Sequence, residues 1–449
     1  MAYETVLRKL LLPGYEAMRG SHTLEYLREY EQQQWLSQEA LAQLQWGKLQ
    51  DLVAHCWEHV PFYRGHWAAA GVASPGDIRS RADFARLPVV SKQDIRQHAA
   101  ALVSGIHRDS LLTKTTGGST GEPLRLLYTR EAFERRMAVM FRGYGWSGAR
   151  MGEKTAYLWG TQPFGSTRMQ RLKERLYHTA YNRLFLSSNA LDETTLERYR
   201  RAINRFRPRT IVAYVSPLEQ LARHLRATGR SMHRPLRILT AAEKLHPQQA
   251  AVIEAALGAP VFDTYGCRET MLVAAQCNAR NGLHVNADHL LLECGHDPAV
   301  HASADTGDVL LTDLHNYGMP LVRYRNGDVA TLREGACDCG RHLPLIAAVE
   351  GRSLDMLLGA DGRIVPGEML VSMLLPYDWI RQYQVRQHPD RSVTVLVVPD
   401  GAGASDGGAQ LLRQMQAAFG EGIPVQLRNV ASIALNRTGK HRVTIREEA

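Results

Sequence analysis

The clearest pattern of apolar and polar positions lies between residues 210 and 264. Three short β-branched or aliphatic runs alternate there with two longer segments of helical periodicity. Ser216-Pro217-Leu218-Glu219 is typical of a capping box, and Gly229 is typical of a helix end. His246-Pro247 and Gly258 bound the second helix in the same way. This order predicts a parallel sheet with covering helices. The predicted strands are Thr210–Tyr214, Leu236–Thr240 and Pro260–Thr264.

The flanking regions have weaker but readable patterns. Residues 1–90 are mainly of helical periodicity, and Val60-Pro61 ends one of these helices. Ser91 is expected to cap the next helix. Residues 108–128 predict a strand, a glycine-rich loop and a second strand. The other predicted elements are helices at 131–145, 168–207 and 409–419, strands at Val309–Asp313, Leu321–Tyr324, Val393–Val398 and Val425–Val430, and a linker at 401–408.

These elements predict an α/β protein with two domains. The large domain, residues 1–350, contains a helical lead-in at about 1–100, parallel α/β subdomains and a β-rich subdomain at about 283–350. Residues 351–449 predict a small α+β domain. The chain of 449 residues is long enough for both domains, and its 45% hydrophobic and 22% charged residues are typical of a globular protein.

Charge and cysteine content narrow the choice of partner and compartment. The net charge of +9 fits a nucleic acid, an anionic small molecule or simply solvated Arg-rich helices. Because nucleic-acid motifs and basic tails are missing, we expect no nucleic-acid partner. No signal peptide and no run of about 20 apolar residues is present, so we expect no membrane span. Six cysteines in so long a chain indicate a reduced, cytoplasmic protein.

The most distinctive stretch for chemistry is Thr115–Pro123, which follows Lys114. Its small residues allow the backbone to wrap closely around an anion, while N–H groups and hydroxyls supply donors. We therefore interpret it as a phosphate-binding loop, with a surface turn as the alternative. It is not the P-loop of NTPases, because Gly121 is followed by Glu-Pro instead of Lys-Ser/Thr.

Further motifs follow this loop in a fixed order. They are Tyr265-Gly266-Cys267-Arg268-Glu269, Tyr324-Arg325-Asn326-Gly327-Asp328, Gly351-Arg352 and Arg437-Thr438-Gly439-Lys440. Each motif is weak alone, but the set in this order resembles the adenylate-forming enzymes over nearly the whole chain. The resemblance is greatest to the phenylacetate–coenzyme A ligase-like branch, which also includes capsule-biosynthesis enzymes.

The resemblance implies a role for each motif. The glycine-rich loop would hold the β- and γ-phosphates of ATP, Glu269 a magnesium ion, and Asp328 the ribose hydroxyls. Tyr265 would stack on adenine, and Lys440 would bridge the carboxylate and the α-phosphate. The implied nucleotide-binding residues are Thr116, Gly117, Gly118, Ser119, Thr120, Gly121, Ala242, Glu243, Tyr265, Gly266, Arg268, Asp328 and Arg352; the catalytic residues are Lys440 and Glu269; Tyr214 and Ser216 would line the acid pocket.

Structural alternatives exist for these residues. Tyr265 could be a core aromatic, Glu269 a helix cap, Asp328 part of a turn, and Lys440 an exposed hairpin lysine. Two positions depart from the usual pattern of the branch. Arg268 stands where many relatives have Thr or Ser, and Leu354 replaces a polar residue at the hinge of the small mobile domain.

The cysteines of the β-rich region predict a metal site. Cys277, His284, Cys337 and Cys339 form a set of three sulfurs and one imidazole that suits a structural tetrahedral zinc. Relatives with a similar pattern are expected to bind zinc there. The alternative is a group of buried thiols with a surface histidine. Cys267 lacks an evident neighbouring base, so we do not interpret it as a nucleophile.

Together these observations predict ATP-dependent activation of a carboxylic acid through an acyl- or aryl-AMP. Transfer of the acyl group to coenzyme A is the expected second step. The alternatives are transfer to an amine or another acceptor, transfer of AMP to a cofactor, and a non-catalytic nucleotide-binding scaffold in a biosynthetic cluster. The acid, the pathway and the oligomeric state are not readable from the sequence, and a homodimer remains open.

Overall fold

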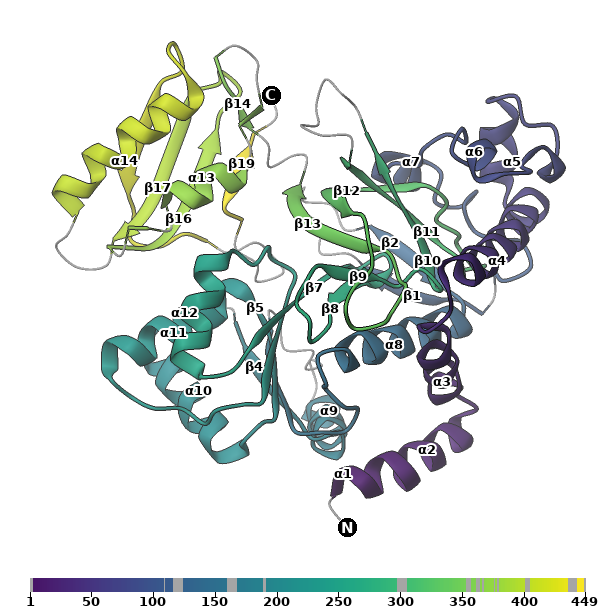
Figure 1. Cartoon of the computed structure of the whole chain (residues 1–449), viewed down its shortest axis with the longest axis horizontal. Helices are drawn as coiled ribbons and strands as arrows, with labels where there is room; N and C mark the ends of the chain where they lie inside the picture. The colour runs from purple at the N-terminus through teal and green to yellow at the C-terminus, as the bar shows by residue number, and fades with distance from the viewer. Residues whose placement is uncertain are drawn as a thin grey trace.

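A long mixed sheet forms the centre of the large part of the molecule (Figure 1). In the part of the chain that the computed structural model describes, this sheet has eleven strands, in the order β10-β11-β12-β13-β9-β8-β7-β6-β5-β3-β4. The described residues are 3–108, 110–115, 124–159, 168–188, 191–296, 305–352, 357–360, 364–365, 367–374, 376–377, 379–399, 404–434 and 442–447.

The parallel half of this sheet confirms the predicted β-α-β-α-β order and extends it. All five of its described strands pair in parallel, and helices α10, α11 and α12 pack their apolar residues on one face. The helix predicted over 168–207 is wrong in its middle, because Arg183–Ser187 forms edge strand β4. The elements are β3 (Thr155–Trp159), α9 (Arg168–Ala180), β4 (Arg183–Ser187), α10 (Glu193–Phe206), β5 (Thr210–Tyr214), α11 (Val215–Thr228), β6 (Arg237–Ala241), α12 (Pro247–Leu257) and β7 (Val261–Cys267).

The antiparallel half continues the same sheet through a β7–β8 hairpin. The predicted β-rich region is therefore confirmed, but it is joined edge to edge with the parallel strands instead of forming a separate sheet. The predicted strand Leu321–Tyr324 is wrong, because the strand begins only at Tyr324. The elements are β8 (Met271–Gln276), β9 (Leu283–Val285), β10 (Leu290–Gly295), β11 (Thr306–Asp313), β12 (Tyr324–Arg333) and β13 (Leu345–Arg352).

The helical lead-in is confirmed, and it packs on the antiparallel half. Ser91 caps its helix as predicted, by accepting a hydrogen bond from the Asp94 N–H. Apolar residues of α4, α5 and α7 share a core with β2 and with residues around Tyr324. The elements are α1 (Tyr3–Val6), η1 (Leu7–Leu11), α2 (Leu12–Arg19), α3 (Thr23–Gln33), α4 (Gln38–His59), α5 (Pro61–Ala68), η2 (Pro75–Asp77), α6 (Arg81–Phe84), α7 (Lys92–Gln97), β1 (Leu112–Thr115), β2 (Arg125–Tyr128) and α8 (Arg130–Gly145).

The C-terminal region has its own sheet, in the order β18-β17-β16-β19, and its own apolar core. The predicted linker at 401–408 is wrong in part, because α14 begins at Ala404. The domain boundary at residue 350 stays a prediction. The elements are β14 (Leu357–Leu358), β15 (Ile364–Val365), α13 (Gly367–Leu374), β16 (Ile380–Gln387), β17 (Val393–Pro399), α14 (Ala404–Phe419), β18 (Val425–Asn429) and β19 (Thr444–Arg446).

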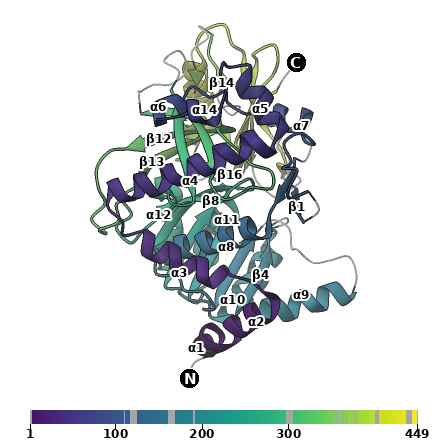
Figure 2. The ribbon, with the colours of Figure 1, turned by 90° about the vertical axis from the view of Figure 1, so that its right-hand side faces the viewer.

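Two views of the ribbon show which elements lie at the two ends of the molecule. The C-terminal sheet lies at one end, and α1, α2 and α9 lie at the other (Figures 1 and 2). None of the described helices is long and apolar enough to cross a membrane.

Candidate active site and metal site

The β7–β8 hairpin presents the first group of predicted site residues. Its turn consists of residues 268–270, and Tyr265 lies two residues before the end of β7. Gly266 is required because an added Cβ would lie 2.0 Å from the carbonyl oxygen of Met271. Since strand β8 follows the turn, Glu269 does not cap a helix. The hairpin therefore places Glu269 and Arg268 at a sheet edge, beside the strands that carry the other motifs.

Glu269 is almost fully buried and held in place by two tyrosines. The Tyr324 hydroxyl donates a hydrogen bond of 2.9 Å to Oε1 of Glu269. The Tyr128 hydroxyl donates one of 2.9 Å to the backbone carbonyl of the same residue. Burial and the Glu269 charge both raise the pKa of Tyr324, so this tyrosine remains a donor at neutral pH. The carboxylate is thus fixed on one oxygen, which suits a ligand for a hard cation.

Asp328 forms a second polar group on β12. The Tyr265 hydroxyl donates to Oδ2 of Asp328 at 2.9 Å, and the Asn326 amide donates to the same oxygen at 2.8 Å. Asn326 also donates to the Tyr265 hydroxyl and accepts from the Asp328 N–H. The local hydrogen bond between Asn326 and Asp328 is the one that a turn would show. Tyr265 is a buried core aromatic whose hydroxyl nevertheless orients the Asp328 carboxylate.

Three cations surround the start of the glycine-rich segment. The Arg268 guanidinium donates to the Thr115 carbonyl, and that of Arg136 donates to the Arg268 carbonyl at 2.6 Å. The Arg136 guanidinium also stacks 4.1 Å from the Tyr128 ring centre. Burial and the charges of both arginines lower the pKa of Lys114. Crowded positive charge of this kind favours an anion.

The predicted acid-pocket residues lie at the carboxyl ends of β5 and β6. The Tyr214 ring centre is 4.4 Å from that of Trp159 on β3, which forms an aromatic wall. The Ser216 N–H donates to the Glu243 carboxylate at 2.7 Å, and Ala242 has a left-handed φ of 70°. The predicted capping box is wrong: α11 begins at Val215 without a side-chain cap, and Glu219 bonds instead to Arg223 and Gln249.

Several predicted site residues lie outside the described residues. They are Thr116, Gly117, Gly118, Ser119, Thr120, Gly121, Leu354 and Lys440. Strands β1 and β2 flank the glycine-rich segment as predicted, and they pair antiparallel to each other. The backbone of Arg352 pairs with Asp328 across β12 and β13, so the two motifs are neighbours.

Cys267 has no environment that would activate a nucleophile. Burial raises the pKa of its thiol to about 12. Its Sγ lies 3.2 Å from the Thr270 hydroxyl, and the nearby Glu269 charge opposes the thiolate further. The structure thus supports the prediction that Cys267 is not a nucleophile.

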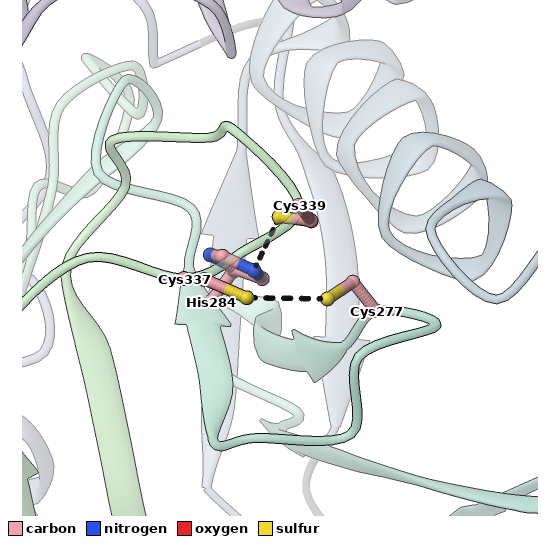
Figure 3. A group of neighbouring side chains, drawn as sticks. All are labelled: Cys277, His284, Cys337 and Cys339. Atoms are coloured by element: carbon pink, nitrogen blue, oxygen red, sulfur yellow. Dashed lines mark hydrogen bonds between the residues drawn. The ribbon is translucent and has the colours of Figure 1, made fainter.

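The predicted metal ligands converge (Figure 3). Cys277 follows β8, His284 lies in β9, and Cys337 and Cys339 lie between β12 and β13. Their ligand atoms all lie within 4.8 Å of one another. The sulfurs of Cys277 and Cys337 are 3.6 Å apart, and that of Cys339 is 3.3 Å from Nε2 of His284. A tetrahedral zinc with zinc–sulfur bonds of about 2.3 Å sets its sulfurs about 3.8 Å apart, so the group fits.

The protonation of His284 also fits a metal ligand. Burial, with the charges of Arg341 and Arg142, lowers its pKa to about 4, so the ring is neutral at physiological pH. A neutral imidazole is the form that binds a metal. The alternative of a surface histidine is wrong, because His284 is fully buried.

Sequence reasoning missed four residues that support the site. Asn326 and Tyr324 belong to the motif Tyr324–Asp328. The hydrogen-bonding groups of their side chains were the only indication in the sequence that they support the site. Trp159 was missed because β3 was not predicted, although the run Thr155–Trp159 contains Thr, Tyr and Trp, which are common in strands. Arg136 gave a weaker signal: it is a charged residue on the buried face of α8.

Comparisons with known proteins bear on the family and the fold of the chain. No family model matches the chain. Phenylacetate-coenzyme A ligase from Thermus thermophilus is 29% identical over 362 residues, which cover 78% of this chain and 79% of that protein. Protein CapK from Staphylococcus aureus is 23% identical over 81% of this chain and 80% of its own length.

Solved structures were compared with the fold of this chain, and they include a CoA ligase. A crystal structure of 2-hydroxyisobutyryl-CoA ligase in the postadenylation state, in complex with R3-HIB-AMP, superposes with a TM-score of 0.74. It is 20% identical and covers 93% of this chain and 92% of its own. The chain is thus similar in sequence to phenylacetate-coenzyme A ligase and to CapK over most of their length, and it has the fold of 2-hydroxyisobutyryl-CoA ligase.

Proposed function

We propose that this protein activates a carboxylic acid with ATP and then transfers the acyl group to coenzyme A. In the first step a carboxylate oxygen attacks the α-phosphorus of ATP, which gives an acyl-AMP and releases pyrophosphate. In the second step the thiol of coenzyme A attacks the acyl carbon, which gives a thioester and AMP. The observation that carries this proposal is the pair of oriented carboxylates, Glu269 and Asp328, beside the cations at the glycine-rich segment. The names of the ligase relatives support both steps.

Each group has a task that its chemistry suits. Asp328, whose Oδ2 accepts hydrogen bonds from Tyr265 and Asn326, would accept the ribose hydroxyls. Lys114, Arg136 and Arg268 lower the cost of bringing the triphosphate beside the acid. Glu269 would hold a magnesium ion, which would neutralise phosphate charge when bound. The hydrogen bond from Tyr324 fixes where that carboxylate points.

The acid is expected to lie against Tyr214 and Trp159. These two rings form an apolar wall at the carboxyl ends of β5 and β3, where ligands of open α/β sheets bind. The Glu243 carboxylate is bonded to the Ser216 N–H, so it closes the polar side of the wall instead of facing a substrate carboxylate. An aromatic acid fits this wall better than a small polar acid.

The group of Cys277, His284, Cys337 and Cys339 would hold a structural zinc ion. Four protein ligands leave no position for water or substrate, so the ion would join β8, β9 and the loop after β12 without taking part in the reaction. The cytoplasmic location and the homodimer stay predictions from the sequence.

A panel of carboxylic acids tests the reaction. Each acid is scored by pyrophosphate exchange into ATP, and the products are then weighed with and without coenzyme A. A thioester that forms only with coenzyme A supports the proposal. An amide formed with added amines, or an AMP-modified cofactor, would assign the second step differently. An absence of exchange with every acid, despite measurable ATP binding, would favour the nucleotide-binding scaffold.

Lys440 allows a sharper test of the first step. Lys440→Met should lower acyl-AMP formation by roughly 10²–10³-fold, because a cation that bridges two repelling anions is lost. Binding of ATP should change little, since the other phosphate contacts remain. Lys173→Met, which changes an exposed lysine on α9, is the control and should keep full activity. Undiminished exchange in the Lys440 variant would contradict the assignment of the catalytic residue.

A further inference from the structure

Exposed apolar side chains concentrate at one end of the molecule. Within the described residues, thirteen large hydrophobic side chains are exposed, and eight of them belong to two short segments, residues 3–19 and 168–180. Single exposed hydrophobic residues are ordinary on a protein surface, but such a concentration marks an interaction surface. We call it the α9 patch; its members are Tyr3, Leu10, Leu11, Met18, Met169, Leu172, Leu176 and Tyr177.

Helix α9 carries the regular part of this patch. Met169, Leu172 and Leu176 follow each other at intervals of three and four residues, so they form one stripe along the helix. All three are more than half exposed, at 62%, 52% and 62%. The opposite side faces the protein, because the His178 ring contacts Phe185 of β4 at 4.3 Å. The helix therefore turns a histidine inward and its apolar stripe outward, the reverse of an ordinary surface helix.

The N-terminal helices add to the same surface. Leu7 and Leu12 are buried and attach η1 and α2 to the body, and Leu7 lies against Gly152. Leu10 and Met18, in contrast, are 63% and 80% exposed. The Tyr3 hydroxyl donates to the carbonyl of Ala180, the last residue of α9, and thereby links the two segments. Both views show α1, α2 and α9 side by side at the end away from the C-terminal sheet (Figures 1 and 2).

Charge indicates which partner fits this surface. The sequence of α9 contains four basic residues, Arg168, Arg171, Lys173 and Arg175, and one acidic residue, Glu174. The whole chain has a net charge of +9. Two copies of such a surface would repel each other, whereas an anionic surface would attract it. An apolar stripe on an Arg/Lys-rich helix is the pattern of helices that lie in a membrane interface.

We propose that the α9 patch binds the surface of an anionic phospholipid membrane. The apolar stripe would enter the boundary between headgroups and acyl chains, while the basic residues would attract the anionic headgroups. The patch lies at the opposite end of the molecule from the C-terminal sheet. This inference does not depend on the proposed reaction.

Vesicle sedimentation without ATP or acid tests the inference. Wild-type protein is mixed with vesicles of phosphatidylglycerol and phosphatidylcholine in equal amounts, or of phosphatidylcholine alone. We expect binding to the anionic vesicles only, weakened by added salt. The double variant Leu172→Glu, Leu176→Glu should bind the anionic vesicles roughly tenfold less, because two carboxylates replace the apolar stripe.

A matched control variant introduces the same two negative charges outside the α9 patch. Ile106→Glu with Leu236→Glu alters two similarly exposed aliphatic residues outside the patch, and it should bind vesicles as the wild type does. Equal losses in both double variants, or equal wild-type binding to neutral and anionic vesicles, would overturn the inference. Sedimentation velocity without vesicles gives a further test. A wild-type dimer that is lost only in the α9 variant, together with an absence of vesicle binding, would also overturn the inference. That result would assign the patch to contact with a second copy of the chain.

Discussion

Strand β8 has a different kind of site at each end. Before its first residue, the hairpin turn carries Glu269, which hydroxyl groups from β2 and β12 hold in place. After its last residue, Cys277 joins a group of three sulfurs and one imidazole. Six residues of extended chain separate the two ends by about 20 Å. The two sites therefore share one rigid element and differ in what orders them.

This difference predicts which substitutions should affect the reaction and which should affect the stability of the fold. At the hairpin end, polar side chains are already oriented by hydrogen bonds, so the carboxylate is in place before any ligand arrives. At the metal end, the sulfurs of Cys277 and Cys337 lie 3.6 Å apart, and a bound ion would hold the four ligands together. Damage to the first end should lower activity with little change in stability, and damage to the second should do the reverse.

The largest effect is expected at the hairpin end. Glu269→Gln keeps the shape and the hydrogen bond from Tyr324 but removes the negative charge that would hold magnesium. We expect acyl-AMP formation to fall by roughly 10²–10³-fold and the thermal midpoint to move by less than about 2 °C. Activity and thermal scans on the same sample measure both. A large loss of stability with proportionate loss of activity would show that Glu269 is mainly structural.

The next largest effect is expected at the metal end. Cys337→Ser with Cys339→Ser should remove bound zinc, about one ion per chain in the wild type. The thermal midpoint should fall by roughly 5–10 °C, because the connection between β8, β9 and the loop after β12 is lost. Metal analysis and calorimetry measure these two quantities.

The control for the metal end is another thiol on the same half of the sheet. Cys294 on β10 is half-buried and lies outside the group of four, with its Sγ 3.7 Å from the Ala330 carbonyl. Cys294→Ser should therefore keep both the zinc content and most of the stability. Wild-type protein that purifies without zinc would contradict the proposed site.

A smaller effect should separate positioning from charge at the hairpin end. Tyr324→Phe leaves the Glu269 charge but removes the hydrogen bond that orients it. We expect activity to fall about tenfold at low magnesium and to recover largely when magnesium is raised, since one lost hydrogen bond costs on the order of 1 kcal/mol. The control is Tyr63→Phe, a buried hydroxyl in the same core that bonds to Pro320 and Val322 instead. Equal magnesium responses in both variants would exclude a positioning role for Tyr324.

The sequence predicts the elements whose signals are local. The strand Thr210–Tyr214 and the helix ends at Gly229 and Gly258 follow from a β-branched run and from glycines in a left-handed conformation. The predicted strand Pro260–Thr264 is found as part of β7, which extends from Val261 to Cys267. Strand β4 could not be predicted, because its five residues lie between two Arg-rich helices whose periodicity hides them. The capping box failed because Glu219 bonds instead to Arg223, one turn further along α11, and to Gln249 of α12.

The site shows the same division between local and tertiary information. Sequence motifs identified Glu269, Asp328 and the four metal ligands as candidate site residues. The structure brings the four metal ligands together and holds Glu269 and Asp328 by hydrogen bonds. No local pattern shows that Tyr324 would orient Glu269, because the two residues are 55 positions apart and meet only across strands. Predicting such pairs requires the register of the sheet, which depends on the whole antiparallel half.

The smallest effect concerns Asp263, a partly buried acid on β7 near the metal end of β8. Its N–H donates to the Gln276 side chain, and its carboxyl accepts from Thr240. Burial raises its pKa to about 7, well above the roughly 3.9 of an unfolded chain. The folded state thus holds the proton more tightly, so this group's stabilising contribution is full below about pH 4 and is lost as the pH rises through 7. Between about pH 6 and 8, wild-type unfolding free energy should fall by about 1 kcal/mol more than that of Asp263→Asn, whose amide imitates the neutral acid.

Urea unfolding of both proteins at the two pH values measures this difference. The control is Asp192→Asn, which removes the charge of an exposed helix cap whose pKa is lowered by its hydrogen bonds to Thr195. Asp192 is ionised throughout this range, so its loss should cost the same stability at both pH values. If Asp263→Asn also changes stability equally at both, then Asp263 is ionised in the fold, and a compensating cation, for which Lys244 is the candidate, must approach it more closely than the structure places it.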